Sequence, residues 1–169
     1  MSDVKAEYSV DLKSAIRDKL SNEIYLKKLS VVKKETVFPI IQIIHAEEFK
    51  NIDCLLCANC CKTTHPLITQ QDVNRISRHL KISGKQFIRN YVLKDYNGEM
   101  MFRAVPCTFL GSENICSIYN VRPEACRRYP HTDEMEYPKR ISLNLSNTLV
   151  CPAAYKILDR LKKAIPLSL

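Results

Sequence analysis

The eight cysteines are the residues of this sequence whose type and spacing could do chemistry. Four of them form the run Cys54-Leu-Leu-Cys57-Ala-Asn-Cys60-Cys61, in which thiols recur every three residues. Zinc sites use such C-x-x-C pairs. Iron–sulfur clusters use C-x-x-C-x-x-C runs that a remote cysteine, often followed by proline, completes. The run therefore predicts a metal centre rather than a set of isolated core cysteines.

The remaining cysteines suggest a second centre. Cys151 precedes Pro152, as the remote cysteine of a four-iron cluster often does. Adjacent Cys60 and Cys61 fit two different centres, because neighbouring side chains tend to diverge. The first predicted set is Cys54, Cys57, Cys60 and Cys151. The second is Cys61, Cys107, Cys116 and Cys126. One polynuclear site, or one site with additional free thiols, is the alternative.

Basic residues surround one of these cysteines in the segment Arg122-Pro123-Glu-Ala-Cys126-Arg127. Pro123 is suited to the first turn of a short helix that would carry Cys126. The Arg122 and Arg127 guanidinium groups could then lower the pKa of a nearby thiol and act on a bound cluster from just outside its ligands. The alternative is an ordinary solvated basic helix end.

Other ligands and catalytic groups are few. His65 and His131 flank the cysteine segments, and either could replace a cysteine, as in Cys₃His zinc sites. The three glycines have no spacing that would form a glycine-rich phosphate-binding loop. No paired carboxylates and no Ser/His/Asp arrangement stand out, so the sequence leaves open whether the protein is an enzyme.

The compartment follows from what the sequence lacks. Its first residues show no basic segment followed by an apolar core, so we expect no secretory signal. No apolar run approaches the ~20 residues that span a bilayer, so we expect no membrane partner. We therefore predict a cytoplasmic protein, in which patterned thiols stay reduced and bind metal rather than form disulfides.

The charge follows the cysteines. The chain has 26 Lys and Arg against 18 Asp and Glu, a net charge of +8, and residues 50–152, which contain every cysteine, carry +5 of it. A four-thiolate zinc site or an oxidised four-iron cluster carries a charge of about −2. We therefore interpret the basic residues as a counter-charge to bound thiolates. Nucleic acid is not expected as a partner, and the sequence identifies no protein partner.

Helical patterns dominate the segments that must position these residues. Apolar residues every four positions predict a helix over residues 11–34. Thr69 and Ser83 begin capping patterns of two further helices, and Pro152 can start a C-terminal one. Tyr96-Asn-Gly98 is a turn signal.

Strand patterns are short. We predict strands at 100–105 and 115–119, paired as a hairpin, and a third at 141–145. The fold class is therefore mainly α with a small antiparallel β-sheet (α+β) and a metal-stabilised, cysteine-rich core. The predicted parts are an N-terminal helical extension (1–49), a cysteine-cluster metal-binding domain (50–152) and a C-terminal helix packed on that domain (153–169).

Four segments of the sequence carry a family resemblance. They are Cys54-x-x-Cys57-x-x-Cys60-Cys61, Pro106-Cys107-Thr-Phe-Leu110, Cys116-Ser-Ile-Tyr119 and Arg122-Pro123-Glu-Ala-Cys126-Arg127. In order and spacing the chain resembles the YkgJ-type cysteine-cluster family, also described as a zinc- or iron-chelating CxxCxxCC domain. Ala58 stands where that family usually has glycine, which questions a tight turn with positive φ there. The resemblance implies metal chelation and leaves the metal and the activity open.

We therefore expect a metal-binding cysteine-cluster protein. It would chelate iron, with an iron–sulfur cluster favoured, or zinc, through the CxxCxxCC motif and the downstream cysteines. Electron transfer or metal handling are the roles that this chemistry allows. A redox or metal-transfer enzyme with a reactive thiolate is one alternative. The other is a structural zinc-binding module that mediates protein or nucleic-acid interaction.

Overall fold

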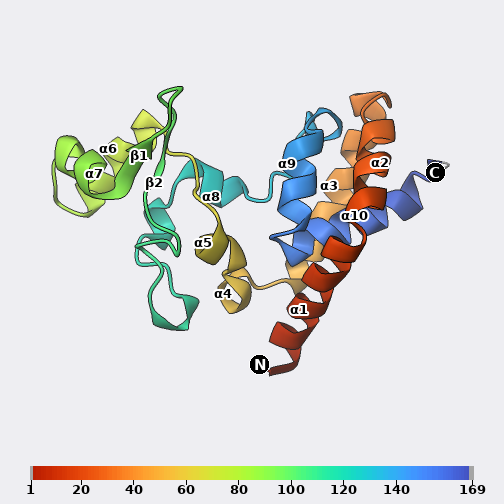
Figure 1. The fold of residues 1–169 in the computed structure, drawn as a ribbon, viewed down its shortest axis with the longest axis horizontal. Coiled ribbons are helices and arrows are strands. Elements are labelled where there is room, and N and C mark those ends of the chain that lie inside the picture. Colours follow the sequence, from red (N-terminus) through yellow and green to blue (C-terminus); the bar gives the residue numbers. More distant parts are fainter. Residues whose placement is uncertain (1, 168–169) are drawn as a thin grey trace. The chain divides into compact units, whose positions relative to one another are not determined.

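The computed structural model describes residues 2–167, and the side chains of residues 7–167. The chain divides into two compact units (Figure 1). Met1–Cys57 and Pro130–Leu169 together form what we call the helical unit, and Ala58–Tyr129 forms the central unit. Among the described residues, no helix is both long enough and apolar enough to cross a membrane. The division of the sequence at residues 49 and 152 stays a prediction.

Helices build almost all of the helical unit. They are α1 (Ser2–Arg17), α2 (Lys19–Leu29), α3 (Lys34–Asn51), α4 (Cys54–Cys57), the 3₁₀ turn η3 (Tyr137–Lys139), α9 (Ile141–Thr148) and α10 (Pro152–Ala164). The helix predicted to start at Pro152 is confirmed as α10, which packs against α1, α3 and α9. The two ends of the chain thus build one core.

That core consists mainly of aliphatic side chains. Its buried members are Tyr25, Leu26, Leu29, Val37, Ile41, Ile44, Tyr137, Ala153, Ile157, Leu158 and Leu161. The Tyr25 hydroxyl lies 3.1 Å from the carbonyl oxygen of Leu161 and 3.0 Å from that of Ile165, which ties α2 to α10. Because each large aliphatic side chain contributes about 2 kcal/mol on burial, this core stabilises the unit mostly through packing.

The predicted helix over residues 11–34 is wrong in its extent and in its buried face. Two helices, α1 and α2, meet at Asp18, whose ψ of 6° departs from helical geometry. Ile16 and Leu20, which belong to the four-residue apolar pattern, are 65% and 70% exposed, whereas Tyr25 is buried. The break at Asp18 therefore turns a different set of side chains toward the core.

The predicted strand at 141–145 is also wrong, because this segment is helix α9. Buried amides define its inner face. Asn144 donates to the Tyr137 carbonyl oxygen (2.6 Å), and Asn147 donates to that of Pro130 (2.8 Å). Alternation of apolar residues misleads here, since polar residues whose amide N–H groups donate to core carbonyls also face the core.

The central unit contains shorter elements. They are α5 (Asn59–Thr63), α6 (Gln70–His79), α7 (Gly84–Tyr91), β1 (Val92–Lys94), β2 (Met100–Phe102), the 3₁₀ turns η1 (Ser112–Asn114) and η2 (Tyr119–Val121), and α8 (Glu124–Arg128). Both predicted caps are confirmed. Thr69 and Asp72 form a reciprocal capping box at the start of α6, and the Ser83 hydroxyl accepts the Gln86 N–H at 3.1 Å at the start of α7.

The small antiparallel sheet exists, but its strands are not the predicted pair. β2 pairs with β1, with Val92 opposite Phe102, across a turn in which Gly98 has φ +82°. Residues 115–119 contribute only an isolated bridge, between Leu110 and Cys116. A short glycine turn between two neighbouring segments closes a hairpin more readily than a longer connection does. The fold is thus mostly helical with one small antiparallel sheet.

Aromatic rings fill the core of the central unit. The rings of Phe87, Tyr91, Phe102 and Phe109 contact one another with centroid separations from 5.0 to 6.5 Å. Partly buried cysteines Cys107 and Cys116 pack against the same cluster. The central unit therefore positions two of its thiols by direct contact with its core.

Candidate metal centres

Helix α4 positions the first two thiols, Cys54 and Cys57, in the helical unit. Asp53 starts this helix, since its carboxylate accepts the Leu55 N–H at 2.8 Å. The Asp53 N–H in turn donates to the Tyr8 hydroxyl of α1 at 3.3 Å. The N-terminal helix is thus tied to the start of the cysteine motif.

Cys151 belongs to the same unit and lies near both of these thiols. Burial raises the pKa of the Cys151 thiol to about 12, and the charges of Cys54 and Cys57 add to that rise. The N–H groups of Ala153 and Ala154, in the first turn of α10, donate to its sulfur. Cys151 is the N-cap residue of that helix. The helical unit therefore groups Cys54, Cys57 and Cys151.

The motif continues into the central unit through Ala58. This residue is buried and has φ +49°, in the left-handed region that favours glycine, so the tight turn forms here despite the alanine side chain. It is the N-cap of α5, which carries Cys60 and Cys61. A hydrogen bond from the Cys60 side chain lowers the pKa of the Cys61 thiol to about 7.

Cys107 and Cys116 lie close to Cys61. The Cys107 N–H donates to the Cys61 carbonyl oxygen at 2.8 Å. Burial raises the pKa of both thiols, and the charge of Cys61 raises each further. Backbone N–H groups of Phe109 and Leu110 donate to the Cys107 sulfur, and that of Ile118 donates to the Cys116 sulfur.

Cys126, on α8, completes the group. Burial raises the pKa of its thiol to about 12, and the charges of Cys61, Cys107 and Cys116 contribute to the rise. The charge of Cys61 thus acts on each of the other three thiols. The four cysteines that the sequence assigns to the second predicted set therefore lie near one another. The group lies entirely within the central unit.

Within each unit the thiols lie near one another, but they are not arranged as a complete ligand set. Among the side chains that the structure describes, residues 7–167, no three of Cys, His, Asp or Glu are arranged to hold a metal ion as they stand. All eight cysteines are thiols rather than disulfides. To bind a metal, the sulfurs would turn toward a common point while the metal displaces their protons. The raised pKa values keep the thiols of Cys107, Cys116, Cys126 and Cys151 protonated until a cation compensates their charge.

The comparison with known families decides the identity of this region. The model of the CxxCxxCC family, described as "Putative zinc- or iron-chelating domain", matches residues 53–151, the span that contains all eight cysteines. The chain belongs to this family. A protein of Methanocaldococcus jannaschii, itself uncharacterised, is 33% identical over 89 residues, which cover 51% of this chain and 48% of the relative. The chain thus spans about half of that relative's length. No solved structure matches the chain.

In this CxxCxxCC domain, the two arginines beside Cys126 differ in what they contact. Arg122 donates to the Tyr119 carbonyl oxygen at 2.7 Å and lies 3.9 Å from the centroid of the Tyr119 ring. Its charge acts to lower the pKa of Cys116 and Cys126 against the larger effect of burial. Arg127 instead donates to the carbonyl oxygens of Arg122 (3.2 Å) and Asn120 (3.0 Å), so it braces the loop before α8.

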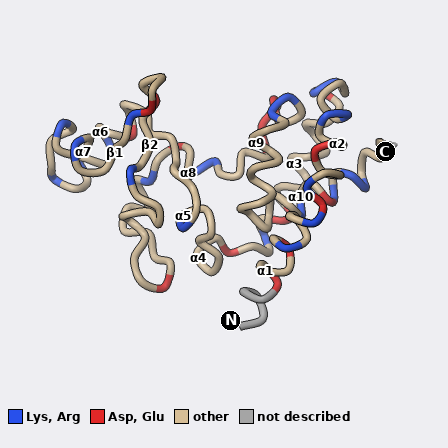
Figure 2. Tube along the Cα trace, viewed as in Figure 1, with Lys and Arg blue, Asp and Glu red and all other residues tan. Residues whose placement is uncertain are grey.

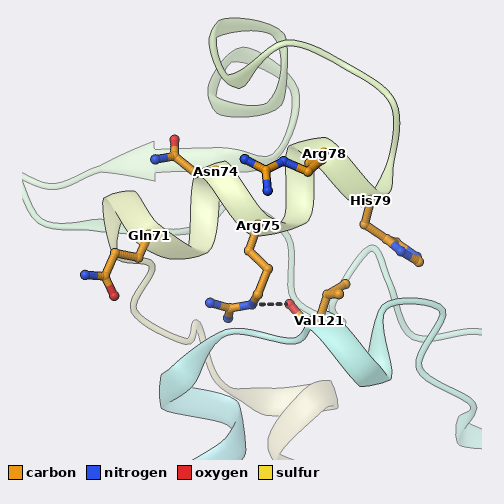
Figure 3. Close-up of a pocket in the computed structure, with 6 residues that line it drawn as sticks. All are labelled: Gln71, Asn74, Arg75, Arg78, His79 and Val121. Atoms are coloured by element: carbon orange, nitrogen blue, oxygen red, sulfur yellow. Dashed lines mark hydrogen bonds between the residues drawn. The ribbon is translucent and has the colours of Figure 1, made fainter.

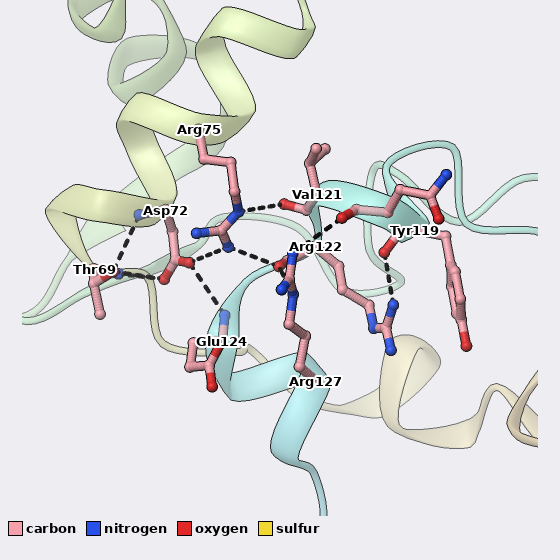
Figure 4. A network of polar contacts seen from close by, with 9 residues as sticks. Thr69, Asp72, Arg75, Tyr119, Val121, Arg122, Glu124 and Arg127 are labelled. Carbon is pink, nitrogen blue, oxygen red and sulfur yellow. Dashed lines mark hydrogen bonds and ion pairs between the residues drawn. The ribbon is translucent and has the colours of Figure 1, made fainter.

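Asp72 has a larger role than its predicted cap. It is 1% exposed, and its carboxylate accepts hydrogen bonds from both the N–H and the hydroxyl of Thr69, from Arg75 (2.5 Å) and from the Glu124 N–H (3.1 Å) (Figure 4). Burial acts to raise the pKa of this carboxyl, but the hydrogen bonds outweigh burial and hold the pKa below its usual range. Because Glu124 starts α8, Asp72 fixes the helix that carries Cys126.

Arg75 extends the same network. Its guanidinium donates to the carbonyl oxygens of Arg122 (2.8 Å) and Val121 (3.4 Å), so α6 is tied to the segment that leads into α8 (Figure 4). The capping pattern signals the position of Asp72 in the sequence. No sequence pattern signals its contact with Glu124, 52 positions further along the chain, since this contact depends on the tertiary fold.

Each of the two candidate histidine ligands makes a hydrogen bond through its Nδ1 atom. The Nδ1 atom of His65 lies 2.8 Å from the Phe102 carbonyl oxygen. That of His131 lies 2.8 Å from a carboxylate oxygen of Glu134. Metal-binding histidines commonly make such a contact with the ring nitrogen that does not hold the metal. Use of either histidine in place of a cysteine therefore stays a prediction.

Proposed function

We propose that the protein binds a metal centre through the four thiolates of Cys61, Cys107, Cys116 and Cys126. The observation that carries this proposal is electrostatic. The pKa of Cys126 is raised by burial and by the charges of the other three cysteines, so the four sulfurs share one environment. Four thiols that destabilise one another as anions gain most from a cation that binds them together.

The backbone around these sulfurs supports the same proposal. Cys107 and Cys116 accept N–H groups from residues two or three positions further along the chain. Such hydrogen bonds stabilise sulfur that carries negative charge, and they tune the potential of thiolate-bound clusters. Arg122 adds a positive charge that acts on Cys116 and Cys126.

We propose a second centre in the helical unit, on Cys54, Cys57 and Cys151. Cys60 as its fourth ligand stays a prediction from the sequence. The support for it is the charge coupling of Cys151 to Cys54 and Cys57, together with two N–H groups at the start of α10 that donate to the Cys151 sulfur. A helix N-terminus favours an anionic thiolate.

An iron–sulfur cluster is the favoured occupant, because the C-x-x-C-x-x-C run and the remote Cys151-Pro152 pair match the ligand pattern of four-iron clusters. With it, the role would be electron transfer or metal handling in the cytoplasm. The second candidate is a structural zinc module that binds an anionic partner, and the basic character of the central unit favours it. Four-thiolate zinc sites have no open position and no redox chemistry.

The metal content of anaerobically isolated protein tests these proposals. We expect brown protein that absorbs near 400 nm and contains iron and acid-labile sulfide. Cys126→Ser should remove one centre, Cys151→Ser the other, and Leu55→Ser, an exposed position between two motif cysteines, should remove neither. Colourless protein with stoichiometric zinc would replace the iron–sulfur proposal by the zinc module. A single centre lost equally in both cysteine variants would refute the division into two.

A further inference from the structure

A cavity of about 480 Å³ lies along α6 in the central unit (Figure 3). Its lining residues are Gln71, Asn74, Arg75, Arg78, His79 and Val121. Ligand pockets for small molecules have volumes of roughly 300–1,000 Å³. None of the lining residues is a cysteine or a carboxylate, so this cavity is chemically different from the candidate metal centres.

Helical spacing sets how the donors are arranged. Gln71, Arg75 and His79 are four residues apart and project on the side of α6 that faces Val121 (Figure 3). Asn74 and Arg78 form a second row, in which the Arg78 guanidinium runs back along the helix toward Asn74. Side chains four residues apart on a helix are neighbours, so amide and cationic donors are close together here.

The basic residues that line the cavity differ in whether their side chains have partners. Arg75 is paired with Asp72 and two carbonyl oxygens. Within the part of the chain that the structure describes, the side chains of Arg78 and His79 make no hydrogen bond or ion pair, and both residues are exposed. Arg78 therefore offers its full set of planar donors to a ligand.

Bound thiolates do not account for the positive charge of this unit. Ala58–Tyr129 contains 11 Lys and Arg and five Asp and Glu, a net charge of +6. One four-thiolate centre with a charge of about −2 would leave about +4. Over residues 50–152 as a whole, by contrast, two such centres would nearly cancel the net positive charge, as the sequence analysis assumes. The remaining charge attracts anions to the central unit.

We propose that the cavity along α6 binds a small molecule through an oxyanion group, a phosphate or a carboxylate. The Arg78 guanidinium matches the geometry of two oxyanion oxygens, and the amides of Gln71 and Asn74 are additional donors. Val121 gives the cavity an apolar wall that suits an uncharged part of the ligand. Arg75 contributes positive charge, while its own donors hold the α6 network in place. The proposal does not depend on which metal the cysteines bind.

Calorimetric titration of the full-length, metal-loaded protein at ~150 mM salt tests it, with pyrophosphate and citrate as probes. We expect saturable binding of at least one probe, and the stronger of the two identifies phosphate or carboxylate as the preferred group. Arg78→Ala should weaken its binding about tenfold or more, because hydrogen bonds to charged groups are the strong ones. Arg78→Lys, which keeps the charge without the planar fork, should restore only part of the affinity.

Arg89→Ala is the matched control, since Arg89 is an exposed arginine of α7 outside the cavity lining. It should bind the probe as the unchanged protein does. Equal weakening by Arg78→Ala and Arg89→Ala, or no binding of either probe, would overturn the proposal. So would binding of a short single-stranded oligonucleotide that both variants weaken equally and that falls steeply with salt, because that is a diffuse basic surface. Iron and zinc contents measured on each variant keep this result separate from failure of the metal proposal.

Discussion

The helical unit and the central unit differ in how far their basic residues are balanced by acidic ones. The helical unit contains 15 basic and 13 acidic side chains, and ion pairs connect its helices, such as Lys156 with Glu7 and Arg160 with Glu48. In the central unit basic residues predominate (Figure 2). Its ion pair between Arg75 and Asp72 fixes a buried network rather than a surface. Charge in the central unit is therefore available for ligands, whereas in the helical unit it mostly stabilises the fold.

The cores differ as well. Long helices of the helical unit bury an aliphatic cluster that extends over α2, α3 and α10. The central unit has short elements, an aromatic cluster, and two cysteines packed against that cluster. Units of about 70 residues seldom gain enough from a hydrophobic core alone and often need a metal. We therefore expect the central unit to depend on the proposed thiolate centre for stability more than the helical unit does.

Metal removal should separate the two units most clearly. We expect a chelator, added anaerobically, to destabilise the central unit by ~5 kcal/mol or more, since thiolate–metal binding energy is folding energy. The measurement is hydrogen exchange followed by mass spectrometry. Amides of α6 and α7 should lose protection, while those of α3 should keep it. Equal loss in α3 and α6 would show that the units do not differ in this way.

Asp72→Asn should have the next largest effect. It removes the charge that accepts hydrogen bonds from Arg75, from two backbone N–H groups and from the Thr69 hydroxyl, at a cost of about 2–4 kcal/mol in the free energy of unfolding. Urea denaturation measures this, with Glu113→Gln as the exposed control. Because Asp72 also holds α8, the variant should bind less metal at the Cys126 centre. An unchanged unfolding free energy would contradict the network's importance.

The same carboxyl predicts a pH dependence. Its pKa is lowered in the folded protein, so its stabilisation is present above the ordinary carboxyl pKa of about 3.9 and is lost as the pH falls through the lowered value. Unfolding free energy of the unchanged protein should therefore fall below about pH 4. Asp72→Asn should lack this part of the decline. Identical acid profiles for the two proteins would contradict it.

Tyr8→Phe tests the contact between α1 and the start of the cysteine motif in the helical unit. The change removes the hydroxyl that accepts the Asp53 N–H, and we expect a loss of about 1 kcal/mol in unfolding free energy. Hydrogen exchange should become faster at the Asp53 amide. Tyr96→Phe, at a 96% exposed position, is the control and should change neither quantity. Unaltered hydrogen exchange at the Asp53 amide in Tyr8→Phe would show that α1 does not stabilise the start of the cysteine motif.

Ala58→Gly should have the smallest effect and the opposite sign. Glycine relieves the left-handed conformation at φ +49°, and loss of a buried methyl group offsets part of that gain, so we expect stabilisation of about 0.5 kcal/mol. Ala15→Gly, in the interior of α1, should instead destabilise by about 1 kcal/mol. Thermal unfolding of both variants provides the comparison. Destabilisation of similar size in both would contradict the strain at Ala58.

Features that depend on neighbouring residues were predictable from the amino-acid sequence alone. The cysteine spacing identified the family, and the Thr69, Ser83 and Pro152 signals located the starts of α6, α7 and α10. The turn signal at Gly98 also formed as predicted. Caps and turns satisfy backbone groups within a few residues, so their patterns are readable without the rest of the chain.

Which faces are buried and which distant groups meet depends instead on the packing of the whole chain. Residues 141–145 form a helix because Asn144 and Asn147 find carbonyl partners in the core. Asp72 reaches Glu124, and one thiol charge acts on three others, through contacts between elements far apart in the chain. Such contacts depend on how whole helices pack, and packing is set by the shapes and burial of many side chains together rather than by any local spacing.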